Sequence, residues 1–400
     1  MSRVLIKVLK ILARSNWWLT GVVMALLVIG VMFVYSACYV GEERGVLRPL
    51  YQRQILWIVV GVVSYFGMAL YDYRRLRQIS WAIYGVGLAL LVLVLLIGST
   101  IYGAQRWLML FGVIGIQPSE IAKLSTIILL AHQLSLPVRN LANLRDLGTM
   151  ILWMGIPVGL IMLQPDLGTA LVFVPTVLIM MFVAGMPFKY LAILATVGIV
   201  VVTLILSSLF LPAKLGASEA TQQRIRKLSF LSEYQQGRIE VFFHPEKDPL
   251  GAGWNKRQSE IAVGSGGLRG KGYLNGTQNI LGFLPRSVAP TDFIYSVIAE
   301  EKGFMGSLMV LALFFGVLIF GAITALRTHD AMGRLLCTGI VSLIFCHVFI
   351  NIAMTVGLMP ITGLPLPLLS YGGTFMVIMM SALGIIQSVH IRSNRREAYD

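Results

Sequence analysis

The residue whose position most favours chemistry is Asp292. It follows Pro290 and Thr291 at the point where a polar, basic and glycine-rich region, 211–292, gives way to apolar sequence at Phe293. A carboxylate at such a boundary can accept a proton from a hydroxyl group. The structural alternative is that Asp292 caps the helix predicted to follow it. We therefore take Asp292 as the candidate catalytic residue.

The polar region also contains glycines interleaved with basic residues, a pattern that can bind an anion. Glycine lets backbone N–H groups converge on a phosphate, and nearby Lys or Arg side chains supply the opposite charge. Arg269 and Lys271 are therefore candidate contacts to a pyrophosphate, although the same pattern is also typical of a mobile loop rich in turns. The other members of the pattern are Gly251, Gly253, Lys256, Arg257, Gly264, Gly266, Gly267, Gly270, Gly272, Gly276 and Gly282.

Ionisable residues within apolar stretches form a second group of candidates, because charge is costly in hydrocarbon. Glu120 and Lys123 lie three residues apart on one helical face, where they can pair. The pair either holds helices together or lines a polar cavity in which Lys123 faces an anionic ligand. Pro118 predicts the start of this helix, and Ser119 is a candidate cap. Asp166, in a predicted tight turn, either contacts a ligand or stabilises the following helix through its dipole.

A proline-rich segment, 359–367, followed by Ser370 and Tyr371, is the third feature. Irregular backbone at membrane depth is tolerated only where protein or a cavity covers it. We therefore expect this segment to line the same chamber as Asp292. Asn351, on the preceding apolar stretch, is a candidate contact, and His347, one turn earlier, is interpreted as a helix-packing residue.

The composition predicts an all-α protein that crosses a membrane many times. With 57% hydrophobic residues, 12% charged residues and a mean hydropathy of +0.80, a soluble globular chain is excluded. Glu300 and Glu301 must face protein or water, or else the span after Asp292 begins near Gly303. No cleavable signal peptide is expected. Apolar runs long enough to cross the hydrocarbon predict ten helices near 16–38, 54–72, 79–98, 118–135, 148–164, 168–186, 188–212, 303–326, 335–358 and 369–391.

The distribution of basic residues predicts the orientation, because short cytoplasmic loops carry most Lys and Arg. Both termini are expected in the cytoplasm and the polar region outside it. Much of the net charge of +14 is assigned to this bias. A three-residue apolar repeat from Ile225 to Tyr234 predicts a helix at the membrane surface. The orienting residues are Arg3, Lys7, Lys10, Arg14, Arg74, Arg75, Arg77, Arg139, Arg145, Lys189, Arg327, Arg334, Arg392, Arg395 and Arg396.

Several classes of function find no support in the sequence. Cys38, Cys337 and Cys346 show neither metal-ligand spacing nor a disulfide framework, and are interpreted as membrane-core residues. There is no phosphate-loop motif for ATP and no signal for nucleic-acid binding. The absence of an internal repeat weakens a transporter built from duplicated halves.

Four blocks of the chain resemble the SEDS family (shape, elongation, division and sporulation), the RodA and FtsW group of bacterial cell-wall polymerases. The resemblance covers almost the whole chain, and the glycine-rich region is more similar to the elongation-type members, RodA, than to FtsW. The family's Glu and His before Thr-Asp-Phe are not matched, since Arg286 follows Pro285 and an insertion precedes Thr291. The blocks are 103–107 with 117–123, 164–169, 291–293 with the loop before it, and 357–373.

The resemblance implies an enzyme of the bacterial inner membrane that polymerises lipid II, the undecaprenyl-pyrophosphate-linked disaccharide-pentapeptide, during cell elongation. It also implies a class B penicillin-binding protein as the crosslinking partner, together with other elongation machinery. Asp292 would take the proton from the 4-hydroxyl of the acceptor sugar. That oxygen would attack C1 of the donor with inversion, and undecaprenyl pyrophosphate would leave.

The departing pyrophosphate needs positive charge more than it needs a proton. Lys271, Arg269 and Arg106 are the candidate side chains, with a divalent cation, Mg²⁺ or Mn²⁺, as a further candidate. Trp107 is expected to pack on sugar or prenyl chain, or else to be an interfacial anchor. The charged pair on the fourth span would line the cavity that admits the lipid tail.

Two other functions are compatible with the pattern. A flippase for the lipid-linked precursor would also need a polar cavity open to lipid, but it would not need a carboxylate beside a glycine-rich loop. A non-enzymatic scaffold for the transpeptidase would tolerate Asp292→Asn.

Overall fold

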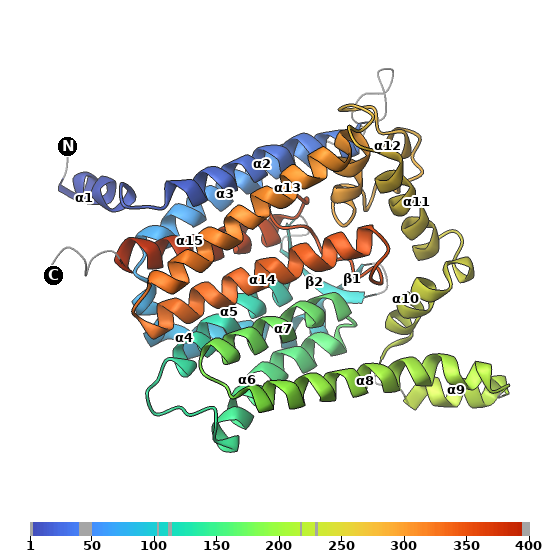
Figure 1. Cartoon of the computed structure of the whole chain (residues 1–400), viewed down its shortest axis with the longest axis horizontal. Helices are drawn as coiled ribbons and strands as arrows, with labels where there is room; N and C mark the ends of the chain where they lie inside the picture. Colours follow the sequence, from blue (N-terminus) through green and yellow to red (C-terminus); the bar gives the residue numbers. More distant parts are fainter. Residues whose placement is uncertain are drawn as a thin grey trace.

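The computed structural model describes residues 3–39, 50–101, 104–110, 114–216, 218–228 and 231–393. Gly103 of the first matching block, and Arg395 and Arg396 of the orienting set, lie outside these residues. Within them the protein is a bundle of long helices with one small sheet, in agreement with the predicted all-α membrane fold (Figure 1).

Each of the ten predicted apolar stretches contains a helix. Eight described helices are long and apolar enough to cross a membrane. The other two, α5 and α7, have 17 residues each, the short end of what can span a bilayer, so their crossing stays a prediction. The ten are α2 (Trp17–Cys38), α3 (Leu50–Leu70), α4 (Leu76–Ile97), α5 (Pro118–Leu134), α6 (Leu144–Leu163), α7 (Leu167–Val183), α8 (Phe188–Lys214), α13 (Ile294–Arg327), α14 (Ala331–Thr355) and α15 (Gly373–Ser393).

Shorter elements join or flank these helices. The polar region is largely helical, and its elements gather at the end of the bundle opposite to both termini (Figure 1). The elements are α1 (Arg3–Leu12), η1 (Tyr73–Arg75), β1 (Ser99–Ile101), β2 (Ala104–Leu110), β3 (Ile114–Ile116), α9 (Glu219–Leu228), α10 (Glu233–Phe243), η2 (Pro245–Lys247), α11 (Ala252–Ser265) and α12 (Thr277–Ile280).

The antiparallel sheet in the order β1-β2-β3 is not predicted by the sequence. It connects α4 to α5 and places Arg106 and Trp107 on its central strand, β2. The sheet therefore brings these two candidates to the same end of the bundle as the polar region.

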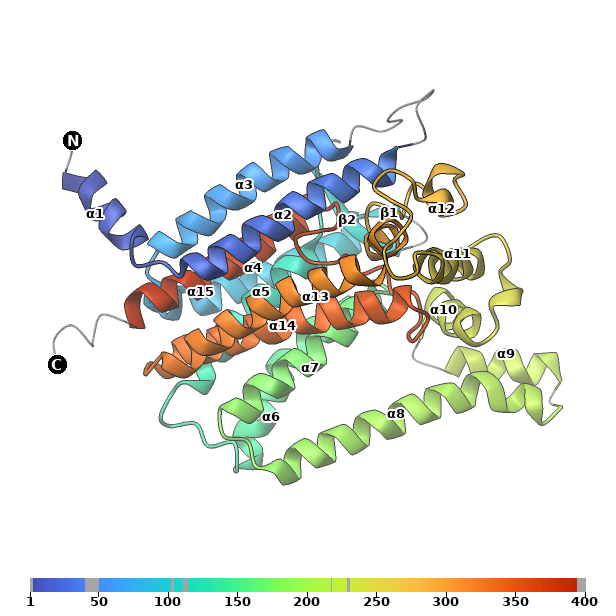
Figure 2. The ribbon, with the colours of Figure 1, turned by 45° about the horizontal axis from the view of Figure 1, so that its top comes forward.

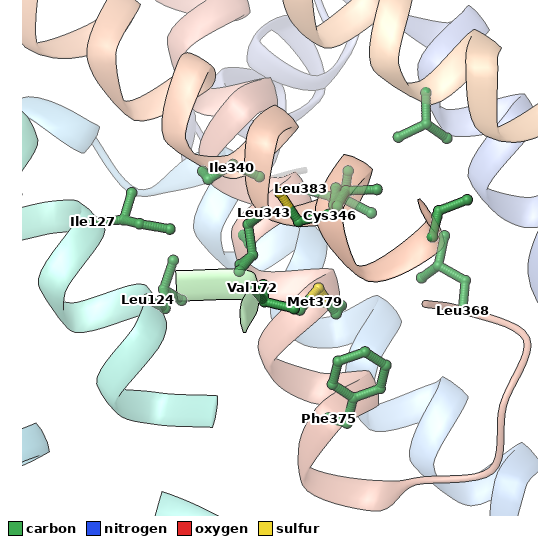
Figure 3. Close-up of a cluster of buried hydrophobic side chains, with 14 of the residues drawn as sticks. Leu124, Ile127, Val172, Ile340, Leu343, Cys346, Leu368, Phe375, Met379 and Leu383 are labelled. Carbon is green, nitrogen blue, oxygen red and sulfur yellow. The ribbon is translucent and has the colours of Figure 1, made fainter. Parts of the chain in front are cut away.

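One part of the core lies where α5, α7, α14 and α15 meet, and Figure 3 shows buried side chains from these helices in one cluster. Leu124 of α5, Val172 of α7 and Leu343 of α14 are among the buried members. Leu368, from the segment before α15, packs into the same cluster. The proline-rich segment is thus fixed to the core close to the site described below.

Helix α13 contains a break that matches the interrupted apolar run in the sequence. Gly303 has φ 64° and ψ −160°, a conformation that favours glycine. Glu300 and Glu301, just before the break, are buried and face protein, which is one of the alternatives that the sequence left open. Gly270 lies against this break, since a Cβ added there would be 2.2 Å from the Glu301 carbonyl oxygen. The glycine-rich region therefore packs closely on α13.

Helix α8 differs from the other long helices because most of its surface is exposed. Figure 2 shows it leaving the bundle at an angle and extending toward α9 and α10. Helix α9 ends at Leu228 and α10 begins at Glu233, so the apolar repeat predicted as one surface helix falls on two helices.

Candidate active site

Asp292 lies directly before α13, at the end of the polar region. The N-cap of α13 is Phe293, without a side-chain hydrogen bond, so the Asp292 carboxylate does not cap the helix. The backbone N–H of Asp292 donates to the Val288 carbonyl oxygen at 3.0 Å. Asp292 is half-buried. Its carboxylate therefore has no structural capping role.

The ionisation of Asp292 is set by burial and by two arginines. Burial raises the pKa of Asp292 to about 6, whereas the charge of Arg238, a hydrogen bond from Thr291 and the charge of Arg106 act to lower the pKa. A carboxyl group with such a pKa exchanges protons readily near neutral pH, which suits a general base. Arg106, a candidate from the sequence, is thus brought close enough to Asp292 to influence its ionisation.

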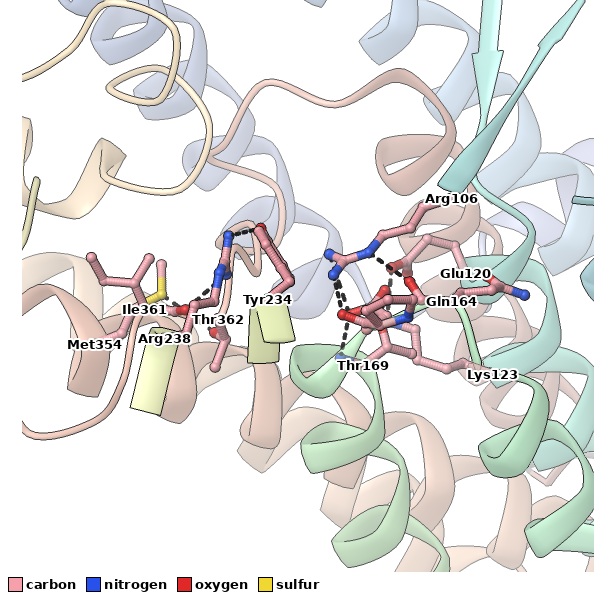
Figure 4. Close-up of polar contacts among 12 residues, drawn as sticks. Arg106, Glu120, Lys123, Gln164, Thr169, Tyr234, Arg238, Met354, Ile361 and Thr362 are labelled. Atoms are coloured by element: carbon pink, nitrogen blue, oxygen red, sulfur yellow. Dashed lines mark hydrogen bonds and ion pairs between the residues drawn. The ribbon is translucent and has the colours of Figure 1, made fainter. Parts of the chain in front are cut away.

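Arg238 and Arg106 reach the site from different elements, α10 and β2. Arg238 donates from Nη1 to the Ile361 carbonyl oxygen at 2.7 Å and from Nη2 to the hydroxyl of Tyr234. Arg106 donates to the carbonyl oxygens of Gln164, at 3.2 Å, and Pro165. Figure 4 shows the two groups of contacts facing each other, with Tyr234 between them. Backbone carbonyls thus hold both guanidinium groups in place.

A cavity of about 290 Å³ lies beside these arginines, enclosed by α7, α8, α10 and the segment 359–362. Its wall is mostly apolar, and Arg106, Tyr234 and Arg238 provide polar groups on it. Such a combination suits a ligand with an anionic group and a hydrocarbon chain. The remaining lining residues are Pro165, Leu167, Leu171, Val202, Ile205, Leu206, Leu231, Gln235, Ile239, Phe242, Phe243, Met359, Pro360, Ile361 and Thr362.

Asp166 is the N-cap of α7, so it stabilises the helix that follows it, one of the two roles expected from the sequence. Its Oδ1 accepts from the Thr169 N–H at 3.1 Å and its Oδ2 from the Thr169 hydroxyl at 2.9 Å. Arg106 Nη1 lies 3.7 Å from Asp166 Oδ1. The turn therefore orients Arg106, and a direct contact of Asp166 with substrate stays a prediction.

Glu120 and Lys123 form the predicted ion pair, with Lys123 Nζ 2.8 Å from Glu120 Oε1. Both side chains are buried, and Lys123 Nζ also lies 2.8 Å from His347 Nε2. His347 thus has a polar contact in addition to packing against Phe375. The start of α5 at Pro118 is confirmed, but Ser119 does not cap it, because the N-cap is Gln117.

Asn351, Ser370 and Tyr371 all contact the backbone of the segment that carries Asp292. Trp107 is half-buried and lies over Gly115 of β3, since a Cβ added to Gly115 would be 3.1 Å from the Trp107 ring. Its packing on a sugar or prenyl chain stays a prediction.

Lys271, between α11 and α12, belongs to a separate cluster that includes Glu300 of α13. Its Nζ lies 2.7 Å from Glu300 Oε1 and 2.6 Å from the Thr277 hydroxyl. Glu300 lies six residue steps beyond Ile294, the first residue of α13, so about 9 Å of helical rise separates it from the end of the helix that adjoins Asp292. Arg269 is exposed. Binding of pyrophosphate by Arg269 and Lys271 stays a prediction, and the observed contacts of Lys271 favour a structural role.

Within the described ranges, no group of three or more His, Cys, Asp or Glu side chains is placed to hold a metal ion. Cys38, Cys337 and Cys346 are buried, in agreement with their interpretation as membrane-core residues. Among the described residues, Arg238 and Arg106 are the basic side chains whose charge acts on Asp292.

Sequence reasoning missed Arg238 and Tyr234. They are four residues apart, and on a helix this spacing places them on one face. The sequence alone does not show that α10 turns this face toward Asp292. That information comes from the packing of α10 against the segment 359–362.

The fold and the site together define the class of protein: a multi-pass membrane protein with a half-buried carboxylate and two arginines beside an apolar cavity. The chain belongs to the FtsW/RodA/SpoVE family, whose model, described as cell cycle protein, matches residues 16–395.

Named relatives cover almost the whole chain. Peptidoglycan glycosyltransferase RodA of Treponema pallidum (strain Nichols) is 35% identical, over 92% of this chain and 96% of that protein. Peptidoglycan glycosyltransferase MrdB of Escherichia coli (strain K12) is 36% identical, over 91% and 92% of the two chains.

Solved structures agree with this assignment. A chain from a peptidoglycan synthase complex that coordinates polymerization and crosslinking has a TM-score of 0.73 at 29% identity, covering 95% of this chain and 99% of that one. The rod shape determining protein RodA of Thermus thermophilus has a TM-score of 0.66 at 27% identity, covering 96% and 98%.

Proposed function

We infer that the protein is a peptidoglycan glycosyltransferase that polymerises lipid II into glycan strands during cell elongation. Relatives with this enzyme name match more than nine tenths of the chain. The observation that carries the chemistry is the half-buried Asp292 carboxylate, whose pKa of about 6 reflects burial opposed by Arg238 and Arg106.

Asp292 accepts the proton of the 4-hydroxyl group on the acceptor sugar. The oxygen forms a bond to C1 of the donor sugar while the bond from C1 to the pyrophosphate oxygen breaks, and the anomeric centre inverts. Undecaprenyl pyrophosphate leaves with the bonding electrons. A general base and a positively charged contact each contribute about 10²–10³-fold or more in rate.

Arg238 and Arg106 neutralise the charge that develops on the pyrophosphate. Each guanidinium group is partly occupied by backbone carbonyls and keeps further N–H groups for phosphate oxygens, since arginine has five donors. The apolar wall of the cavity accommodates the prenyl chain next to the pyrophosphate. The exposed helix α8 borders this cavity. The part of the prenyl chain that extends beyond the cavity can pass along α8 into the bilayer.

A flippase is disfavoured because the RodA and MrdB relatives are named as peptidoglycan glycosyltransferases. The solved complex similar to this chain coordinates polymerization with crosslinking, which supports a class B penicillin-binding protein as partner. We further propose the bacterial inner membrane as location, with both termini cytoplasmic and 211–292 as the extracytoplasmic part of one membrane domain. Both termini lie at the opposite end of the bundle from this region (Figure 1).

A divalent cation, Mg²⁺ or Mn²⁺, stays a proposal. Because the described residues offer no cluster of three ligands, such an ion would be held chiefly by pyrophosphate oxygens. Chelation by EDTA, followed by addition of Mg²⁺ or Mn²⁺, tests for this requirement.

The deciding experiment uses the purified protein, with and without its penicillin-binding partner, and labelled lipid II. The wild-type protein should produce glycan ladders, and Asp292→Asn should not. Thermal unfolding of the same samples shows whether the variant is folded. Transbilayer movement of label without polymer would support the flippase, and normal ladders from Asp292→Asn would exclude Asp292 as the base.

A further inference from the structure

The segment that carries Asp292 is held through its backbone by α14 and the residues before α15. The carbonyl oxygens of the three consecutive residues 290–292 each accept one hydrogen bond from a donor on α14 or on the residues before α15. Tyr371 N–H donates to Pro290 at 2.8 Å, and the Ser370 hydroxyl donates to Thr291 at 2.5 Å. Asn351 Nδ2 donates to the Asp292 carbonyl oxygen at 2.9 Å. The backbone of 290–292 therefore has little freedom to rotate.

The side chains of Asn351 and Ser370 have no donor left for a substrate. Asn351 is fully buried, at 0% exposure, and its Nδ2 group also donates to the Leu364 carbonyl oxygen at 2.6 Å. Both N–H bonds of the amide are thus used. The amide oxygen, Oδ1, accepts no hydrogen bond from the described residues, but it is buried out of reach of a ligand. The Ser370 hydroxyl donates its one proton to Thr291 and accepts from Leu366 N–H at 2.8 Å.

The segment 359–367, between α14 and α15, also lies against Asp292 and Arg238. A Cβ added to Gly363 would be 3.5 Å from Asp292 Oδ2 and 3.4 Å from Arg238 Nη1. Gly363 has φ 73°, which favours glycine. Arg238 is bonded to the Ile361 carbonyl oxygen of this segment. One stretch of chain therefore fixes both the carboxylate and its arginine.

We infer that Asn351 and Ser370 are positioning residues that fix Asp292, and that they do not contact the substrate. This inference rests on the proposed function, in which Asp292 is the general base. Catalysis by a base depends on its placement relative to the reacting hydroxyl, and a displacement of about 1 Å can cost about 10²-fold in rate.

The test compares Asn351→Leu and Ser370→Ala with Thr355→Val in the full-length protein, using lipid II polymerisation with the partner present. Thr355 is a matched control, because it is equally buried on α14 and its hydroxyl bonds only to its own helix, at the Ile352 carbonyl oxygen. Initial rates are measured against lipid II concentration and against pH, and thermal unfolding is recorded for each variant.

We expect kcat to fall about 10- to 100-fold in both test variants, with the KM for lipid II changed by less than about threefold. The acidic limb of the pH profile should also move, since the carboxylate changes its distance from Arg238. Thr355→Val should behave as wild type. A rise in KM with kcat preserved would show a substrate contact and overturn the inference.

Two controls keep the result decisive. Ser370→Ala removes a single oxygen, and it decides the question if Asn351→Leu fails to fold. Asp292→Asn is measured in parallel. Normal polymerisation by Asp292→Asn would contradict the proposed function itself. If Asp292→Asn is inactive while Asn351→Leu and Ser370→Ala are fully active, only the positioning role is contradicted.

Discussion

The guanidinium group of Arg238 lies 4.6 Å from the ring centroid of Tyr234 and donates a hydrogen bond to the Tyr234 hydroxyl. Arg106 faces the same ring at 5.6 Å. An aromatic ring between two cations attracts both through its π-electrons. Tyr234 therefore keeps two arginines close together beside Asp292.

Removal of Arg238 should slow catalysis strongly. Arg238→Ala should lower kcat/KM for lipid II polymerisation by about 10²–10³-fold, because a charge that stabilises the leaving pyrophosphate is lost. Arg238→Lys should recover only part of this loss, since an ammonium group lacks the planar fork of donors. Lys247→Ala serves as control, because Lys247 is in the same polar region, half exposed and paired with Glu240. Equal rates for Arg238→Ala and Lys247→Ala would contradict the assignment.

The rate of polymerisation should depend on the ionisation of Asp292. The pKa of about 6 lies above the usual value for aspartate because of burial, and only the deprotonated form can accept a proton. The rate should therefore rise with pH, with a midpoint near 6. In Arg238→Gln the midpoint should move to higher pH, because the charge of Arg238 lowers this pKa. Initial rates at constant ionic strength provide the measurement, and a midpoint that falls in the variant would refute this account.

The pair formed by Lys271 and Glu300 should contribute mainly to stability. Lys271→Met leaves the Glu300 carboxylate, 1% exposed, without its charged partner, and should lower the free energy of unfolding by about 1–3 kcal/mol. Glu300→Gln in the same chain should restore much of this loss, because it removes the uncompensated charge. Thermal unfolding and polymerisation are measured together. A double variant that regains stability but stays inactive would instead indicate that Lys271 contacts the pyrophosphate.

The orientation can be tested with single cysteines, because Cys38, Cys337 and Cys346 are buried and should react slowly. Leu250, in the polar region, is 91% exposed, and Val138, between α5 and α6, is 87% exposed. In intact cells Leu250→Cys should react with a membrane-impermeant maleimide, and Val138→Cys should react only after lysis. The opposite pattern would reverse the proposed topology.

Most of the long helices can be predicted from the sequence, because about twenty consecutive apolar residues have few other stable structures in a bilayer. The contact of Glu300 and Glu301 with protein is one of the alternatives that the sequence offers, since carboxylates cannot face lipid. The break at Gly303 inside α13 does not follow from this argument. The small sheet is not predictable either, because β1, β2 and β3 are short and depend on pairing with one another.

The candidate site could be predicted only in part. Asp292 is marked by its place at the end of a polar region, and the pairing of Glu120 with Lys123 follows from helical spacing. Arg238 could not be identified, since its role depends on how α10 packs. Substrate binding by Asn351 and Ser370 stays a prediction, and the sequence does not show that their donor groups bond to backbone carbonyl oxygens within the protein.

The hydrogen bonds to the carbonyls of 290–292 also have a consequence for biosynthesis. A nascent chain that ends after α13 already has Asp292, but it lacks the amide, hydroxyl and N–H donors of Asn351, Ser370 and Tyr371. The last two long helices must therefore be inserted before the base is correctly placed. A partly synthesised enzyme at the ribosome should consequently be unable to consume precursor until its translation is nearly finished.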